Sequence, residues 1–473
     1  MSRPAHPQIS FADWELLRQG LVLEPVLRRI ADFLDEHAEM IETIRGDLRR
    51  GLKNPDTGRN GLSAQQVLRS LILMRVKNWD YRELRERIAD GYTLRQFTQF
   101  YCQRVPKHDA FQRAFVRLTP ATLRAVNESL VQAAVTLGLE DGTKLRVDTT
   151  VVQTDIHHPT DNTLLWDVVR VVTRWVGRLA KALKLRRIKG FRDRRRSARR
   201  RMYEIQRMTT RQRHDQQTAT YRELIGMTEE VVDNARAALD MTSKTRGKDM
   251  LAELAIAAIR EQIEHFCGLG ERVIDQARRR VLNGEQVPNA EKIYSIFEPH
   301  TDLIKRGKVR TPIEFGHKVF LAESAKGLIT QYEVLKGNPS DEIHVAPSLT
   351  RHKQAFGRAP ELYGSDRGFF SEQNVASCVQ SDVKVACIPQ RGGKKTPERE
   401  AYEKSADFKQ GQRFRAGIEG RISVLFRGRG MKRCLAEGAE RFELWVAAAV
   451  LANNLMTIAA LLTKRSARRR KAA

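Results

Sequence analysis

The sequence predicts a mixed α/β fold in which a long helical block interrupts the strand-forming part of the chain. Strand patterns occur at residues 143–155, which are rich in Val and Thr, and again between residues 317 and 389. Between these two regions, more than a hundred residues show the i, i+3, i+4, i+7 apolar spacing of amphipathic helices. Helical patterns also fill the N-terminal region, so a helical domain is expected to precede the α/β part.

The charge of the chain indicates a polyanionic partner. Its 473 residues include 84 Lys plus Arg and 57 Asp plus Glu, a formal net charge of +27. Nucleic acid is the commonest partner of so basic a protein, and an anionic membrane surface is the alternative. We expect double-stranded DNA and no membrane partner.

Cysteine usage and apolar segments point to a cytoplasmic, nucleoid-associated protein. The five cysteines are scattered without a Cys-x-x-Cys spacing, which excludes a zinc ribbon and favours a reducing compartment. The first twenty residues lack the pattern of a signal peptide. Residues 444–463 are long and apolar enough to cross a bilayer. Asn453 and Asn454 lie at the centre of this stretch, where they would be costly in lipid, so a helix buried behind a sheet is expected.

The N-terminal region, residues 1–135, is predicted to be a helical DNA-binding domain. Ser63 with Gln66, and Asp80 with Glu83, have the spacing of helix-capping boxes. Two short helices within about residues 62–90 therefore form a helix-turn-helix-like unit. Many helical hairpins bind nothing, so DNA contact and a purely structural role both stay open here.

The helical block at residues 165–290 follows a first strand-bearing segment at residues 140–164. Residues 181–213 contain fifteen basic residues and two acids. Such a run is often a solvated helix face or a disordered segment. In so basic a chain we favour contacts to DNA phosphates, which release counterions. The arginines expected to make them are Arg194, Arg195, Arg199 and Arg200.

The strand pattern resumes within residues 291–463. The segments "HKVFLAES" and "LITQYEVLKG" form a hairpin pattern, and a helix is expected from Asp341 to about Phe356. The stretch "ELYGSDRGFF" at residues 361–370 ends a short strand, and "VKVACIP" predicts another. The final basic residues, 464–473, are expected to be a flexible tail that contacts phosphates non-specifically.

Three acidic residues stand in unusual sequence surroundings. Asp148 lies within a Val-rich strand, where a charge must be paired or bound to a metal. Asp366 lies at the end of a strand, where it could instead cap a following helix. Glu419 lies in the helix-like segment "FRAGIEGRISVLFRGRG". Three carboxylates from two strands and a helix could hold Mg²⁺ for phosphoryl transfer, which commonly uses two metal ions.

These segments together resemble the DDE transposases of bacterial insertion sequences, closest to the ISNCY group. The resemblance rests on the order and spacing of "GLSAQQVLRSLILMRVKNWDYRELRERIADG", "LRVDTTVVQTDIHHPTDN", "IYSIFEPHTDLIKRGK", "GHKVFLAES", "YGSDRGFFSEQN" and "RFELWVAAAVLANNL". It implies an RNase H-like mixed sheet flanked by helices. It also implies Asp148, Asp366 and Glu419 as the catalytic, metal-binding triad, with Mg²⁺ as cofactor and Mn²⁺ as a substitute.

The surroundings of Glu419 depart in part from the pattern of many insertion-sequence enzymes, Tyr-x2-Arg-x3-Glu-x6-Lys. Arg415 fits, whereas Gln412 occupies the Tyr position and Phe426 the Lys position. Arg427, one residue further on, could supply the cation. Asp155 and Glu323 are the carboxylates that could replace Glu419 if it is not the third ligand.

The cations beside the acids are expected to contact DNA. Arg367 could neutralise Asp366 or hold the scissile phosphate, and Arg415 could pair with Glu419 or contact a phosphate. His157 and His158 are expected to be structural or to contact DNA, because the chemistry prefers oxygen ligands.

The predicted activity is binding of terminal inverted repeats, metal-dependent cleavage of a phosphodiester and transfer of the resulting 3′-hydroxyl to target DNA. Pairing two element ends requires a homodimer or a larger assembly on DNA. The alternatives are an inactive DNA-binding relative and a simple metal-dependent endonuclease.

Overall fold

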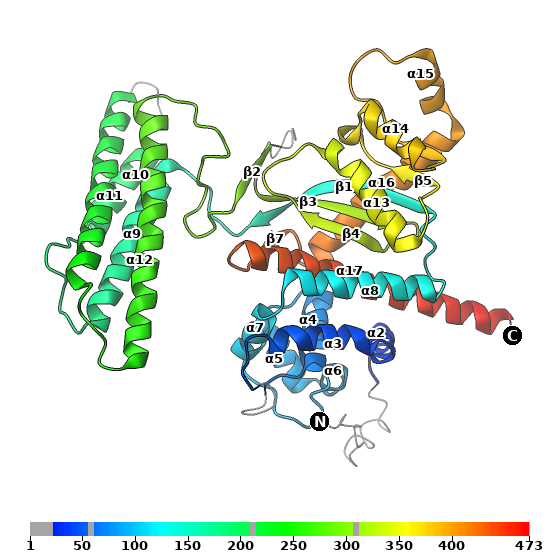
Figure 1. Ribbon diagram of the computed structural model, residues 1–473, viewed down its shortest axis with the longest axis horizontal. Coiled ribbons are helices and arrows are strands. Elements are labelled where there is room, and N and C mark those ends of the chain that lie inside the picture. The colour runs from blue at the N-terminus through cyan, green and yellow to red at the C-terminus, as the bar shows by residue number, and fades with distance from the viewer. Residues whose placement is uncertain (1–21, 55–60, 209–213, 306–311, 473) are drawn as a thin grey trace. The chain divides into compact units, whose positions relative to one another are not determined.

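The computed structural model describes residues 22–54, 61–208, 214–305 and 312–472. The chain forms two compact units (Figure 1). The first combines residues 1–153 with 317–473, and the second comprises residues 154–316. A seven-stranded mixed sheet surrounded by helices confirms the mixed α/β class.

The first unit begins with helices packed around one apolar core. They are α2 (Pro25–Glu36), α3 (Ala38–Arg49), α4 (Ala64–Lys77), α5 (Tyr81–Asp90), α6 (Tyr92–Phe97), α7 (His108–Val116) and α8 (Pro120–Thr136). The capping box predicted at Ser63 is confirmed, because its side chain and that of Gln66 each accept a bond from the other's backbone N–H. Helix α4 is buried along most of its length, whereas α5 exposes arginines on one face.

The strands of the sheet come from widely separated parts of the chain. They are β1 (Lys144–Thr154), β2 (Asp302–Lys305), β3 (Ile313–Ser324), β4 (Ile329–Val334), β5 (Leu362–Gly364), β6 (Val385–Cys387) and β7 (Arg433–Cys434). The order is β2-β3-β1-β5-β6, with β4 paired to β3 and β7 to β1. The predicted hairpin of β3 and β4 is confirmed as an antiparallel pair, and β1, β5 and β6 run parallel.

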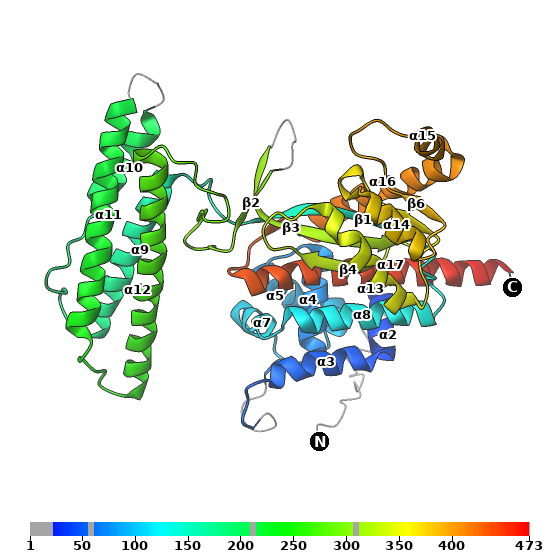
Figure 2. The ribbon, with the colours of Figure 1, turned by 45° about the horizontal axis from the view of Figure 1, so that its top comes forward.

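Helices cover both faces of this sheet (Figure 2). The remaining elements of the unit are a 3₁₀ turn at Asp341–His344, α13 (Val345–Phe356), a 3₁₀ turn at Arg367–Phe369, α14 (Glu372–Gln380), α15 (Pro397–Lys404), α16 (Ala406–Gly428) and α17 (Ala439–Ala472). Side chains alternate along a strand, so Leu145 and Val147 pack into the core that also contains residues of α13 and α14. Arg146 and Asp148 therefore face the other side, where α16 lies.

Helix α17 is the apolar segment predicted to be buried behind the sheet. By length and composition alone, residues 439–471 could cross a membrane, but 67% of the apolar window is buried within the protein. Its core residues pack with those of α2, α4, α8 and β4. The prediction of a flexible tail at residues 464–473 is wrong for residues 464–472, which continue the helix. Residue 473 lies outside the described residues.

The second unit contains a bundle of long helices with its own core (Figure 1). These are α9 (Asp161–Ala182), α10 (Arg195–Arg207), α11 (His214–Thr242) and α12 (Met250–Ala277), which ends in a π-helical turn at Arg278–Leu282. The predicted helices are confirmed here because α9 buries valines and leucines at helical spacing. Part of the basic run, residues 209–213, lies outside the described residues.

Candidate active site

Strand register places the first two predicted acids next to each other. The parallel pairing of β1 with β5 joins Lys144 to Leu362 and ends at Arg146 and Gly364. Asp148 and Asp366 each lie two residues beyond that last pair. Because paired positions of parallel strands lie side by side, the two carboxylates approach each other, Asp148 from within β1 and Asp366 from just after β5, although 218 residues separate them in the sequence.

Arg415 of α16 brings the three predicted acids together. Its Nη2 lies 3.0 Å from Oδ2 of Asp148 and 3.8 Å from Oδ2 of Asp366. Its Nη1 lies 3.1 Å from Oε1 of Glu419, one helical turn further along α16. One guanidinium therefore contacts carboxylates from β1, from the loop after β5 and from α16, and its single charge offsets part of theirs. Three acids so close together would otherwise repel one another.

The two aspartates and the glutamate differ in exposure. The side chain of Asp148 is 11% exposed, that of Asp366 37% and that of Glu419 68%. Asp148 also accepts a bond from the backbone N–H of Thr149. Glu419 lies at the open side of the cluster, where a ligand from solvent could reach it.

Asp366 also has the capping role that was the alternative interpretation of its position. Its Oδ1 accepts a bond of 2.8 Å from the backbone N–H of Gly368, which starts a 3₁₀ turn instead of an α-helix. The following helix, α14, is capped by Ser371. Arg367 is exposed, and among the described acids none forms an ion pair with it. Asp366 is neutralised by Arg415 rather than by its neighbour.

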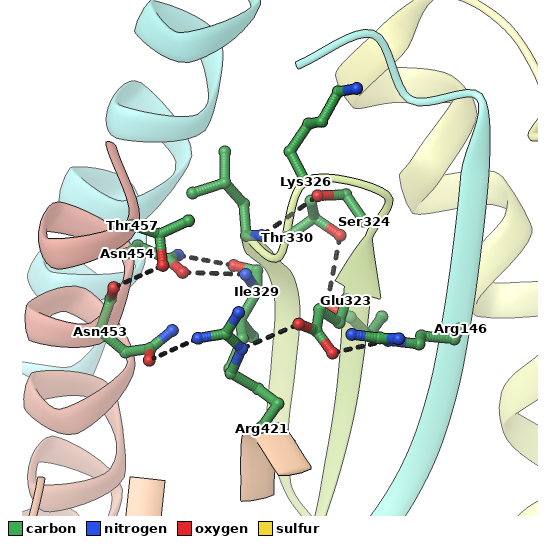
Figure 3. A network of polar contacts seen from close by, with 12 residues as sticks. Arg146, Glu323, Ser324, Lys326, Ile329, Thr330, Arg421, Asn453, Asn454 and Thr457 are labelled. Atoms are coloured by element: carbon green, nitrogen blue, oxygen red, sulfur yellow. Dashed lines mark hydrogen bonds and ion pairs between the residues drawn. The ribbon is translucent and has the colours of Figure 1, made fainter. Parts of the chain in front are cut away.

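One buried acid with two arginine partners, together with further hydrogen bonds, fastens α16 to the sheet (Figure 3). Glu323 of β3 is fully buried and accepts bonds from Arg146 of β1 at 2.7 Å and from Arg421 of α16 at 2.8 Å. Arg146 also donates to the carbonyl of Phe414, inside α16. Arg421 reaches Asn453 of α17. Glu323 is thus a structural clamp, which argues against its use as a replacement ligand.

Gln412, which departs from the family pattern, also holds α16. Its side-chain amide donates to the carbonyl of Cys387 at the end of β6, at 3.2 Å. Phe426, the other departure, packs against the apolar core. Arg427 is exposed and donates to Ser423, and in the described residues it contacts none of the three acids.

Two glycines let α16 lie this close to the sheet. A Cβ on Gly364 would stand 3.3 Å from the Cβ of Arg415. A Cβ on Gly417 would stand 2.1 Å from Nη1 of Arg146, the atom that donates to Phe414. A larger residue at position 364 would press on α16 at Arg415, and one at position 417 would displace the Arg146 guanidinium from the carbonyl of Phe414.

Asp341 is a further acid beside the cluster that the sequence did not single out. Its Oδ1 accepts a bond of 2.9 Å from the hydroxyl of Thr149 and lies 2.7 Å from Nζ of Lys318. A Cβ on Gly368 would be 3.0 Å from both Asp341 and Asp366. The sequence signal was hidden, because Asp341 begins the predicted helix and reads as an ordinary first-turn acid.

The carboxylate oxygens of the three acids are suitable ligands for a hard divalent cation, although the side chains are arranged around the guanidinium of Arg415. Three carboxylates supply the oxygen ligands that Mg²⁺ prefers. Over the described ranges, no group of three His, Cys, Asp or Glu side chains is close enough together to hold an ion as they lie. The nearby thiol does not compete, because burial raises the pKa of Cys387 to about 11.

The other predicted residues belong to the second unit. His157 lies 3.5 Å from Asp167, and His158 packs edge-on against Phe315. Asp155 is exposed. Of the basic run, Arg195, Arg199 and Arg200 lie on α10, whereas Arg194 precedes that helix and pairs with Glu230 at 2.5 Å.

Comparison with known proteins identifies the N-terminal part of the chain. Residues 21–117 match the family model described as Transposase domain (DUF772). This range contains helices α2 to α7 of the first unit. The match supports a transposase family, and so a DNA-processing enzyme. No curated protein and no solved structure matched the chain.

Proposed function

We propose that the chain is a DDE-type transposase of an insertion sequence, with Asp148, Asp366 and Glu419 as its catalytic carboxylates. The observation that carries this proposal is the convergence of these three acids on Arg415 from β1, β5 and α16. The transposase-domain match at residues 21–117 supports it independently, because that match lies outside the acidic cluster.

The sheet supports the RNase H-like arrangement. Strands β1, β5 and β6 are parallel, and β3 and β4 form an antiparallel pair next to β1. This arrangement brings the middle of β1 and the end of β5 together, with α16 beside them. DNA carrying the element ends could approach the exposed side chains of Glu419 and Arg367.

Asp148, Asp366 and Glu419 would hold Mg²⁺, or Mn²⁺ in its place. Bound there, the cation would lower the pKa of an attacking water or 3′-hydroxyl and stabilise the charge on the leaving oxygen. The chain's own contribution is positional. The clamp at Glu323 fixes α16, Arg415 is the cation nearest the carboxylates, and Arg367 is free to meet a phosphate.

DNA is the proposed partner, both as element ends and as target. Arg367 and Arg427 are exposed and would contact phosphates, with Arg415 able to join them once its carboxylates are otherwise neutralised. Pairing of two ends would require a homodimer or a larger assembly on DNA, formed in the cytoplasm at the nucleoid.

Asp148→Asn and Asp366→Asn test the proposal. Each substitution keeps the shape of the side chain and removes its charge. We expect cleavage of DNA carrying the element ends to fall by about 10²-fold or more, because metal-dependent charge stabilisation is worth several kcal/mol. Binding of the same DNA should persist, as measured by gel mobility shift.

The matched control is Asp382→Asn. Asp382 is exposed and has a φ of 63°, a conformation that Asn adopts readily. This variant should cut DNA like the unaltered protein. Unchanged cleavage in both site variants would contradict the proposed triad.

A second assay separates the proposed transposase from a simple endonuclease and from an inactive relative. Pre-cleaved ends with free 3′-hydroxyls are supplied together with a target plasmid. A transposase joins them to the plasmid, an endonuclease only nicks the plasmid, and an inactive DNA-binding relative does neither.

A further inference from the structure

The second unit has a basic hollow between α9 and α10. Six arginines line it: Arg170 and Arg174 from α9, and Arg195, Arg196, Arg199 and Arg200 from α10. Only one acid, Asp193, shares the lining. Positions 170 and 174, like 195/196 and 199/200, are four residues apart, so each helix presents its cations on one face.

Within the described residues, half of these cations have no acidic partner. Arg170 pairs with Asp167 at 2.5 Å, Arg195 with Asp193 at 2.6 Å, and Arg200 lies 3.6 Å from Glu204. Arg174, Arg196 and Arg199 are exposed, and no acid of the described chain forms an ion pair with them. A concave surface that keeps three unneutralised guanidinium groups together is suited to an anion.

The shape and lining favour a polymer of phosphates over a single small anion. The hollow is open to solvent and extends along two helices instead of converging on one point. Two aromatic side chains, Trp166 and Tyr203, also line it, and Tyr203 is 42% exposed. Arginines beside exposed aromatic rings are typical of surfaces that bind nucleic acid, where they meet phosphates and bases.

We propose that this hollow binds the phosphodiester backbone of DNA through Arg174, Arg196 and Arg199. The proposal rests on the DNA-processing function proposed above and adds a second contact, which includes α9 as well as the basic run. On the same criterion it does not rely on Arg194, Arg195 or Arg200, which pair with Glu230, Asp193 and Glu204.

The test compares two triple variants of the full-length protein. One carries Arg174→Gln, Arg196→Gln and Arg199→Gln. The control carries Arg222→Gln, Lys244→Gln and Arg272→Gln, which are exposed cations of the same unit outside the hollow. Both lose three positive charges, so any effect of net charge is equal. Thermal unfolding of each variant verifies that the fold is intact.

Binding to a fluorescent duplex of random sequence is measured by anisotropy over a range of salt concentrations. For the hollow variant, we expect the slope of log affinity against log salt to fall by about 2 to 3, since each lost phosphate contact removes close to one unit. The control should retain its slope. Equal slopes in the two variants would overturn the proposal.

Two further arms identify the form of DNA and separate this inference from the catalytic one. Tyr203→Ala should weaken binding of a single-stranded oligonucleotide if unpaired bases stack there, and should leave duplex binding unchanged if only phosphates are held. A protein that shows the predicted slopes but fails to cut DNA would refute the proposed function and keep the hollow. If the protein cuts DNA normally but the hollow variant keeps an unaltered salt slope, the result would refute DNA binding in the hollow and keep the proposed function.

Discussion

Arg415 is the residue around which the candidate site is arranged. Its side chain is 16% exposed and contacts all three acids. A guanidinium offers several donors in one plane, so it can meet carboxylates from different elements at the same time. The guanidinium thus offsets part of the repulsion among the carboxylates, and a divalent cation held by the same oxygens would compete with it.

Arg415→Gln should therefore have opposite effects on stability and on cation binding. We expect the free energy of unfolding without metal to fall by roughly 3 kcal/mol, because Asp148 loses its partly buried partner. The affinity for Mg²⁺ or Mn²⁺ should rise about tenfold or more, since a unit charge about 4 Å away is worth ~4 kcal/mol before screening. Urea unfolding and titration calorimetry measure the two effects.

The control for this substitution is Arg427→Gln, on the same helix but without contact to the acids. It should change neither quantity. If Arg415→Gln weakened cation binding instead, Arg415 would be acting as a support for the carboxylates and not as a competitor.

At this scale the sequence could predict which residues to examine but not how they meet. A charge inside a Val-rich strand and another at a strand end are local signals, and they indicated Asp148 and Asp366. The contact of Asp148 with Arg415 spans 267 residues, and no local pattern encodes it. Asp341 escaped notice for the same reason, since its partners Thr149 and Lys318 lie on other strands.

Among the elements, α16 depends most on one buried charge. Glu323 has no exposed surface and binds two arginines from different elements. A buried carboxylate is stable only when it is paired in this way. Its two ion pairs fix the distance between β1, β3 and α16, and so the distance between Asp148 and Arg415.

Glu323→Gln should loosen α16. The substitution leaves two half-buried guanidinium groups without a counter-charge, which we expect to cost about 3–5 kcal/mol of unfolding free energy. Hydrogen exchange should accelerate in α16 more than in α13, which packs on the opposite face. The control is Glu333→Gln on the neighbouring strand β4, where the exposed pair with Arg351 should contribute at most about 1 kcal/mol. Similar losses in the two variants would exclude a clamp.

Helices and strands were predicted correctly from the sequence where the apolar periodicity extended over many residues. The amphipathic helices of the second unit and the alternating hairpin of β3 and β4 were foreseen for this reason. The tail was mispredicted, because its basic composition obscured a helix that is continuous with α17. There Arg465 donates to the carbonyl of Leu137, a tertiary contact that favours order.

In the first unit as a whole, α17 joins the matched transposase domain to the sheet. Arg75 of α4 is buried and stacks on Trp445 of α17 with its guanidinium carbon 4.0 Å from the ring centre. Burial lowers the pKa of Arg75 to about 10, and the residue still remains charged at neutral pH. Trp445 in turn donates to the carbonyl of Gly430, after α16. The N-terminal helices and the sheet should therefore unfold together.

Trp445→Ala tests this coupling. We expect a loss of about 3–5 kcal/mol, from the missing ring and its stacked cation, with faster hydrogen exchange in both α4 and α16. The matched control is Trp175→Ala in the second unit, where Arg178 stacks on the ring at 4.4 Å. It should affect α9 and leave α4 unchanged. Independent melting of the N-terminal helices in the unaltered protein would contradict the coupling.

The second unit is inserted between two neighbouring strands of the sheet, and this position affects how related sequences can diverge. The chain leaves after residue 153 on β1 and returns at residue 317 on β3, and these strands are neighbours in the sheet. The free energy of closing a loop between two adjacent strands depends little on the length of the inserted segment, by ~0.6 kcal/mol for each doubling of length. Recombination could therefore replace this module with one of another size while the pairing of β1, β3 and β5 stays intact. Such a replacement would leave Asp148, Asp366 and Glu419, all in the first unit, unchanged.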